Sequence, residues 1–176
     1  LKGAQVDGHD FIAEAVRNGA IGLMIEQSKK NCLQTVDTTQ LKKLSVVLVP
    51  DTHQALLSLA THWRAQFSIP VVGITGSFGK TSVKERLAYI AKLAGKKCLA
   101  SYGNQNTVIG LSLTILRMQA EHEVAIFELG ISKRGEMKRL VAIAQPTIAV
   151  ITSIGHCHME GLGSLADIAN EKREIF

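Results

Sequence analysis

One eleven-residue stretch, residues 71–81, constrains the fold of this chain more than any other. Its sequence is Val-Val-Gly-Ile-Thr-Gly-Ser-Phe-Gly-Lys-Thr, which predicts a short buried strand over 71–75, a glycine loop and a helix that begins near Lys80. Gly76 and Gly79 let backbone N–H groups converge on an anion without interference from a Cβ atom. The first turn of the helix adds unpaired N–H groups and the positive end of its dipole. The stretch therefore predicts a loop that holds nucleotide phosphates.

The loop departs from the strict phosphate-loop pattern at one position. In Gly-x-x-x-x-Gly-Lys-[Ser/Thr] the residue five before Gly79 is glycine, whereas this chain has Ile74 there. The alternative is an ordinary strand–helix turn with a surface lysine, but the apolar strand before the loop and the helical pattern after it favour phosphate binding. Lys80 can contact the β- and γ-phosphates, and the Thr81 hydroxyl can bind Mg²⁺. The residues expected to bind the nucleotide are Thr75, Gly76, Ser77, Phe78, Gly79, Lys80 and Thr81.

The composition limits the classes of protein to which the chain can belong. With 46% hydrophobic residues and three prolines among 176 residues, it fits a folded α/β protein. No run approaches the roughly 18 apolar residues of a membrane helix, so no membrane insertion is expected. A net charge of +5 without a dense stripe, together with 5% aromatic residues, argues against nucleic acid as a partner. Three widely spaced cysteines are typical of reduced thiols in a cytoplasmic protein.

The ends of the chain indicate a piece of a longer protein. The chain starts at Leu1 without a basic-then-apolar signal segment, and it stops at Phe176 inside an expected helix. We therefore expect this piece to be inactive by itself.

Residues 1–69 are expected to form a small α/β domain. Its predicted elements are a helix ending near residue 18, strands at 20–26 and 45–49, one short element between them and a helix at 51–67. Trp63 lies on the apolar side of the last helix, which predicts a place in the core. Pro70 ends that helix and marks the expected domain boundary.

Residues 70–176 alternate apolar strands with helices. Strands are predicted at 71–75, 98–101, 124–129 and 147–154, and helices at 80–94, 108–118, 135–144 and from about 164. This order predicts an incomplete domain like that of phosphate-loop NTPases, with a mostly parallel sheet covered by helices on both faces. Ligands of such sheets bind at the carboxyl ends of the strands, so the site residues should lie there.

Several polar residues follow these strands. Glu128 ends an apolar strand, where its carboxylate can hold Mg²⁺ directly or through water, although a capping or solvated glutamate is the alternative. His156 and His158 follow the last strand. Their spacing is weak evidence for zinc. His158 is the better candidate for a contact with substrate-side Mg²⁺, and a solvated loop histidine is the alternative.

Asn104, Asn106 and Lys172 each have an ordinary interpretation beside a functional one. The two asparagines lie in a loop beside Gly103, where they can bind phosphate or sugar or can simply form a turn. Spacing alone makes Lys172 an exposed helix lysine.

Taken together, these stretches resemble the Mur ligase family, ATP-dependent amide-forming enzymes of peptidoglycan synthesis, and most closely its MurF type. The likeness runs nearly the whole chain. It is carried by Leu-Lys-Gly and Asp-Gly-His-Asp-Phe near the start, Gly-Ile-Thr-Gly-Ser-Phe-Gly-Lys-Thr-Ser-Val-Lys-Glu at 73–85, Gly-Asn-Gln-Asn at 103–106, Glu-Leu-Gly at 128–130, His-Met-Glu-Gly-Leu-Gly-Ser at 158–164 and Lys-Arg-Glu-Ile-Phe at 172–176. This family writes its phosphate loop without the first glycine.

The resemblance implies roles that spacing does not. Lys80, Lys172 and His158 would be catalytic, with Lys172 carrying a carbamate. Thr81, Glu128 and His158 would bind Mg²⁺. Residues 1–69 would bind the UDP end of the substrate and residues 70–176 would bind ATP. The implied substrate-binding residues are Lys2, Gly3, Asp7, His9, Asn104 and Asn106.

The resemblance also implies a reaction. A carboxylate of UDP-N-acetylmuramoyl-tripeptide would attack the γ-phosphorus of ATP, and D-alanyl-D-alanine would displace phosphate from the resulting acyl phosphate. A monomer with these small-molecule substrates is expected. The alternatives are a ligase of the MurE, folylpolyglutamate or cyanophycin synthetase type, a phosphate-loop kinase or ATPase, and a nucleotide-binding regulatory module.

Overall fold

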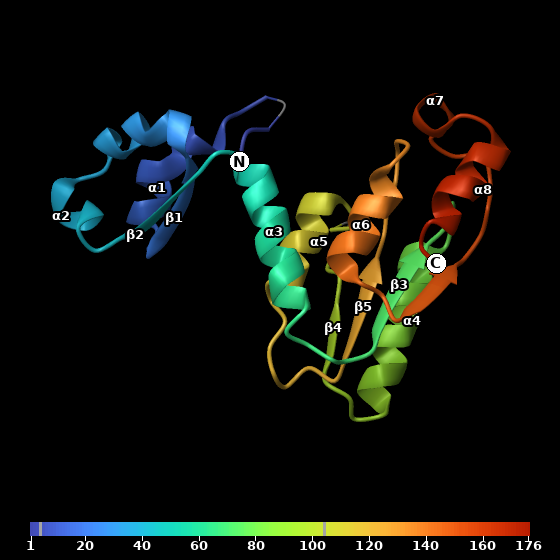
Figure 1. Ribbon diagram of the computed structural model, residues 1–176. Coiled ribbons are helices and arrows are strands. Elements are labelled where there is room, and N and C mark those ends of the chain that lie inside the picture. The colour runs from blue at the N-terminus through green and yellow to red at the C-terminus, as the bar shows by residue number, and fades with distance from the viewer. Residues whose placement is uncertain (4, 104) are drawn as a thin grey trace. The chain divides into compact units, whose positions relative to one another are not determined.

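The computed structural model describes residues 1–3, 5–103 and 105–176. The chain divides into two compact units, Leu1–Leu56 and Leu57–Phe176, each with its own core (Figure 1). Both units mix helices with parallel strands, which confirms the predicted α/β class.

The first unit is built on two parallel strands, β1 (Gly22–Glu26) and β2 (Ser45–Val49). Its helical segments pack apolar side chains on this pair, with Ile12, Val16, Ile25 and Val36 buried. The sequence predicted one short element between the strands, whereas the structure has two. The helical segments are η1 (Gly8–Phe11), α1 (Ile12–Arg17), η2 (Gln27–Thr35) and α2 (Thr38–Leu41).

The second unit contains a four-stranded parallel sheet in the order β4-β5-β3-β6. Parallel pairing brings the carboxyl ends of all four strands to one edge, and β3 lies between β5 and β6. The strands are β3 (Val71–Thr75), β4 (Cys98–Ala100), β5 (Val124–Glu128) and β6 (Ile148–Ile151). The helices are α3 (Thr52–Arg64), α4 (Lys80–Leu93), α5 (Val108–Ile115), α6 (Glu136–Ala144), α7 (Met159–Leu162) and α8 (Leu165–Arg173).

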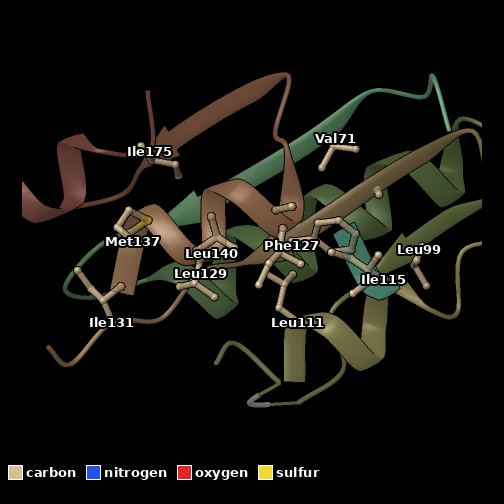
Figure 2. Close-up of a cluster of buried hydrophobic side chains, with 14 of the residues drawn as sticks. Val71, Leu99, Leu111, Ile115, Phe127, Leu129, Ile131, Met137, Leu140 and Ile175 are labelled. Atoms are coloured by element: carbon tan, nitrogen blue, oxygen red, sulfur yellow. The ribbon is translucent and has the colours of Figure 1, made fainter. Parts of the chain in front are cut away.

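The two faces of this sheet are covered by different helices. Ala125 and Phe127 of β5 belong to a cluster with apolar side chains of α5 and α6, whereas Ile126 between them is buried outside that cluster. Figure 2 shows the cluster, with Leu111 and Ile115 of α5 and Met137 and Leu140 of α6 near the strands. Helix α4 packs against β3, β4 and β5. Helices therefore cover both faces, as the alternating pattern predicted.

Helix α3 crosses the division between the two units. Its second half belongs to the second unit because Ala60 is buried in the large core and the Arg64 guanidinium donates to the carbonyl oxygens of Ala144 (2.8 Å) and Gln145 (3.0 Å) at the end of α6. A cation at a helix carboxyl end is favourable. The boundary between the two compact units therefore lies before these residues, earlier in the chain than Pro70. The boundary at Pro70 between the functional domains stays a prediction.

The predicted core position of Trp63 is wrong. Its side chain is 38% exposed, and its indole N–H donates to the Met118 carbonyl oxygen (3.1 Å). The buried stripe of α3 contains Leu56, Ala60 and Arg64, one helical position away from the apolar side that the sequence suggests. Because this buried face includes an arginine, a search for apolar residues at helical spacing does not identify it.

The other differences concern short segments. Helix α7 was not predicted, and the last strand ends at Ile151 rather than residue 154. In the described part of the chain, no helix is long and apolar enough to span a membrane.

Candidate active site at the carboxyl ends of the strands

The glycine loop between β3 and α4 lies against the segment that follows β6. Gly76 has φ +151°, and a Cβ atom there would overlap the Thr152 hydroxyl oxygen, so this close approach requires glycine. The Ser77 N–H donates to the Ser153 carbonyl oxygen (2.9 Å), and the Phe78 N–H donates to Ser153 Oγ (2.9 Å). The segment after β6 therefore fixes the loop conformation, a role that the sequence did not indicate for Thr152 and Ser153.

The positive end of α4 is open to an anion. Gly79 is the N-cap residue with φ +80°, and within the described residues no side chain caps the first N–H groups of the helix. Lys80 is half-buried and its Nζ donates to the Gly76 carbonyl oxygen (2.8 Å), which holds the ammonium over the loop. Thr75 Oγ1 is buried and has no hydrogen-bond partner among the described residues. These features fit a site for a bound phosphate chain.

Glu128 is the central carboxylate of the site. It is 3% exposed, and its two oxygens accept hydrogen bonds from Thr81 Oγ1 (2.8 Å) and Asn106 Nδ2 (2.9 Å). Its backbone N–H donates to Ser101 Oγ (3.2 Å), so residues from α4, β5 and the segment after β4 meet here. The structure thus brings together three residues that the sequence singled out separately.

This oxygen set fits a magnesium ion. Mg²⁺ binds through one or two carboxylates together with water and substrate phosphates, and the paired oxygens of Glu128 and Thr81 lie at the uncapped N-terminal end of α4. Within residues 1–3, 5–103 and 105–176, no three His, Cys, Asp or Glu side chains cluster as a metal site. His158 is exposed at the N-cap of α7 with φ +51°, a strained conformation for a residue with a side chain. Its predicted contact with Mg²⁺ stays a prediction.

Gly130 gives Asn106 the space that it needs. A Cβ atom on Gly130 would lie 2.8 Å from Asn106 Cγ, and the Gly130 N–H donates to the Asn106 carbonyl oxygen (2.9 Å). The amide of Asn106 is therefore held between Gly130 and Glu128.

Replacing Gly130 by alanine is expected to push the Asn106 amide away from Glu128. In the complete protein that contains this chain, the Mg²⁺ concentration needed for half-maximal enhancement of ADP affinity should rise about tenfold, because a partner that orients the candidate metal ligand is lost. Calorimetric titration of ADP at several Mg²⁺ concentrations measures this. Gly22→Ala is the control, since a Cβ atom there meets its nearest neighbour at 3.4 Å. An unchanged Mg²⁺ midpoint in Gly130→Ala would show that Asn106 does not orient the carboxylate.

Lys172 is not the exposed helix lysine that its spacing predicts. Its side chain is 2% exposed near the end of α8. Burial lowers the pKa of the ammonium, a nearby Cys157 opposes this shift, and the positive charge of Lys80 lowers the pKa further. Lys172 therefore lies within electrostatic reach of the phosphate loop, which the spacing along α8 cannot reveal.

The candidate substrate residues of the first unit form a local network. His9 is 4% exposed, its Nε2 accepts the Glu26 N–H (3.0 Å), and its Nδ1 therefore carries the proton that it shares with Asp7 Oδ1 (2.6 Å). The backbone N–H and ring N–H of His9 hold the pKa of Asp7 far below its usual range. Both ring nitrogens of His9 are thus used within the fold.

The remaining candidates differ in what the structure says of them. Lys2 is exposed, and its carbonyl oxygen lies 3.0 Å from His53 Nε2. Gly3 is also exposed, and its N–H donates to the Val6 carbonyl oxygen (2.8 Å). Asn104 lies outside the described residues. Substrate binding by these residues stays a prediction.

The geometry of the second unit agrees with a comparison to known protein families. A model of the Mur ligase middle domain matches residues 74–176, which is more than half of the chain. The chain belongs to the Mur ligase family. The match begins in β3 and includes the glycine loop, Glu128 and Lys172, so the Mur ligase domain model covers these candidate residues of the second unit.

Individual Mur ligases are similar over the full length of the chain. The UDP-N-acetylmuramoyl-tripeptide–D-alanyl-D-alanine ligase of Treponema pallidum is 41% identical over 100% of the chain, and that of Escherichia coli is 39% identical over 100% of it. Among solved structures, MurF of Acinetobacter baumannii has a TM-score of 0.83 at 32% identity, and the MurF ligase of Thermotoga maritima in complex with ADP has 0.81 at 36%. Each structure covers 99% of the chain. The chain spans only 36–38% of the length of these relatives.

Proposed function

We propose that the protein containing this chain is an ATP-dependent ligase of peptidoglycan precursor synthesis. It joins D-alanyl-D-alanine to UDP-N-acetylmuramoyl-tripeptide. The observation that carries this proposal is the junction of Thr81, Glu128 and Asn106 beside an open helix terminus. The names of the similar proteins supply the substrates, and the ADP complex of one relative supports the nucleotide. We further propose that residues 1–69 bind the UDP end, and that the ligase acts as a monomer in the cytoplasm.

The residues of the second unit have separable tasks in this reaction. The first N–H groups of α4 and the Lys80 ammonium neutralise the phosphate oxygens, so that an anionic carboxylate can approach the γ-phosphorus. The carboxylate oxygen forms a bond to the γ-phosphorus as ADP leaves. The amine nitrogen then attacks the carbonyl carbon of the acyl phosphate, the carbon–oxygen bond to phosphate breaks, and the nitrogen releases a proton. Thr152 and Ser153 keep the loop in place and contribute positioning.

Glu128 and Thr81 would hold Mg²⁺, with His158 as a further candidate ligand. When bound, the ion supplies neutralising charge to the phosphate oxygens. Glu128 suits this task because Thr81 and Asn106 orient both carboxylate oxygens. Ser77 and Phe78 hold the shape of the loop through their backbone N–H groups.

Lys172 would carry a carbamate. Its neutral amine can attack carbon dioxide, form an N–C bond and release a proton. The lowered pKa enlarges the neutral, reactive fraction at a given pH, and the nearby Lys80 charge favours the carbamate anion over the ammonium. The burial of Lys172 thus supports the role that the family resemblance implies.

Removal of dissolved carbon dioxide is expected to lower turnover, and added bicarbonate should restore it. Lys172→Met should be less active and insensitive to bicarbonate, because methionine cannot form a carbamate. Phosphate release in degassed and bicarbonate-supplemented buffer at constant pH measures this. Lys138→Met, which replaces an exposed lysine of α6, is the control and should respond like the unchanged protein. Equal turnover of the unchanged protein in both buffers would show that turnover does not depend on a carbamate at Lys172.

The overall function is tested by phosphate release from ATP and Mg²⁺ by the complete protein that contains this chain. UDP-N-acetylmuramoyl-tripeptide and D-alanyl-D-alanine are added singly and together. Release that requires both substrates supports the ligase, whereas release indifferent to them would return the chain to the wider class of phosphate-loop ATPases.

A further inference from the structure

Lys84 is a fully buried charged residue that the proposed reaction does not use. Its side chain has no exposed surface, although it lies on α4 only one turn beyond Lys80 and Thr81. Its Nζ donates to the Ser101 carbonyl oxygen (2.8 Å), pairs with Glu85 Oε1 (3.0 Å) and lies 3.5 Å from the Gly103 carbonyl oxygen. These three contacts match the three N–H donors of an ammonium. A buried lysine with all its donors engaged indicates a specific structural task.

The contacts of Lys84 form a closed chain with the candidate metal site. Ser101 accepts from Lys84 through its carbonyl oxygen, and its Oγ accepts from the Glu128 N–H (3.2 Å). Glu128 in turn accepts from Thr81, which lies three positions before Lys84 on the same face of α4. The chain therefore runs from α4 through Ser101 and Glu128 back to α4. It fixes the distance between the helix and the end of β5.

Lys84 also contacts a second carbonyl oxygen beyond β4. Its Nζ lies 3.5 Å from the Gly103 carbonyl oxygen, in addition to its bond to the Ser101 carbonyl oxygen. A change at Lys84 can therefore reach Glu128 by two routes. One passes through Ser101, which binds the Glu128 N–H, and the other through Thr81 on the same helix, which binds a carboxylate oxygen.

We propose that Lys84 is a positioning residue that sets the Glu128 carboxylate for magnesium-dependent nucleotide binding. This inference rests on the proposed function for the identity of the ligand. Lys84 does not touch the nucleotide. It acts through Ser101, and it couples the phosphate-binding helix to the carboxylate.

The test measures how much Mg²⁺ strengthens ADP binding in the complete protein that contains this chain. ADP is titrated calorimetrically with and without Mg²⁺. Lys84→Met removes the ammonium but keeps much of the side-chain length. It should reduce the factor by which Mg²⁺ raises ADP affinity at least about fivefold. ADP affinity without Mg²⁺ should stay within about twofold, because the glycine loop and the α4 N–H groups are unchanged. Lys84→Arg retains donors and charge and should lose less of the enhancement.

Two further variants keep the test decisive. Lys92→Met replaces an exposed lysine in the last turn of the same helix and should behave like the unchanged protein. Ser101→Ala removes the hydroxyl that joins Lys84 to the Glu128 N–H, and it should also lower the enhancement even if Lys84→Met fails to fold.

The outcomes separate this inference from the proposed function. Full enhancement in both Lys84→Met and Ser101→Ala would overturn the positioning role while leaving the nucleotide site intact. Equal weakening of ADP binding with and without Mg²⁺ would also overturn it, because that pattern indicates general damage to the fold. Failure of the unchanged protein to bind ADP would instead contradict the proposed function.

Discussion

Replacing Lys80 by alanine is expected to lower turnover of the complete protein on the order of 10³-fold, the loss typical when a group that stabilises transition-state charge is removed. The ammonium of Lys80 lies over the glycine loop, bonded to the Gly76 carbonyl oxygen at 2.8 Å, beside the open end of α4. Two anions meet when a carboxylate approaches the γ-phosphate, so this positive charge matters most in the transition state. We expect kcat to fall far more than nucleotide affinity. Steady-state phosphate release and a separate ADP titration measure the two effects.

The matched control for Lys80→Ala is Lys92→Ala. Lys92 is exposed in the last turn of the same helix, so its loss changes the net charge by the same amount without touching the loop. Lys92→Ala should retain the turnover of the unchanged protein. Retained turnover in Lys80→Ala would exclude the glycine loop as the site of phosphoryl transfer.

Replacing Glu128 by glutamine is expected to lower turnover by about 100-fold or more, because a metal ion at such a site contributes several kcal/mol of charge stabilisation. Glutamine keeps the size of the side chain and can keep both hydrogen bonds. Its oxygen can accept from Asn106, and its amide can donate to a rotated Thr81 hydroxyl. The fold should therefore survive, and the loss should appear in the Mg²⁺ dependence of phosphate release and of ADP binding.

Thermal unfolding and a second carboxylate control this prediction. Glu128→Gln should unfold near the temperature of the unchanged protein. Glu121→Gln, at an exposed position shortly before β5, should change neither stability nor Mg²⁺ dependence. If the Mg²⁺ concentration that gives half-maximal phosphate release and ADP binding is unaltered in Glu128→Gln, this carboxylate does not hold the ion.

The parts of the site that the sequence predicts are those fixed by local signals. The apolar run before Gly76 and the helical pattern after Gly79 are enough to place the loop between β3 and α4. Glu128 follows from a similar argument, because a polar residue that ends a buried parallel strand must lie at the ligand-binding edge of the sheet. Neither step needs knowledge of distant contacts.

The parts that the sequence misses depend on packing between distant segments. Lys172 and Lys84 carry no local signal of burial, and the ammonium of Lys84 binds the carbonyl oxygen of Ser101, which lies 17 positions away in the chain. The prediction for Trp63 is wrong for the same reason. Arg64 binds the carbonyl oxygens at the end of α6, so the buried face of α3 contains Arg64 rather than its neighbour Trp63. The hydrogen bonds between Ser153 and the glycine loop likewise require that β6 lies beside β3, which the sequence does not reveal. Buried polar groups are recognised by their partners, which a single sequence does not identify.

The proposed reaction activates a carboxylate by transferring the γ-phosphoryl group of ATP to it. The most direct test uses the tripeptide substrate labelled with ¹⁸O in the carboxylate that becomes the amide. When the amine displaces phosphate, the oxygen that bonded to phosphorus leaves with it. We expect one labelled oxygen in each phosphate released, measured by mass spectrometry. Amide formation with unlabelled phosphate would exclude an acyl phosphate intermediate, because the carboxylate oxygen would then never have bonded to phosphorus.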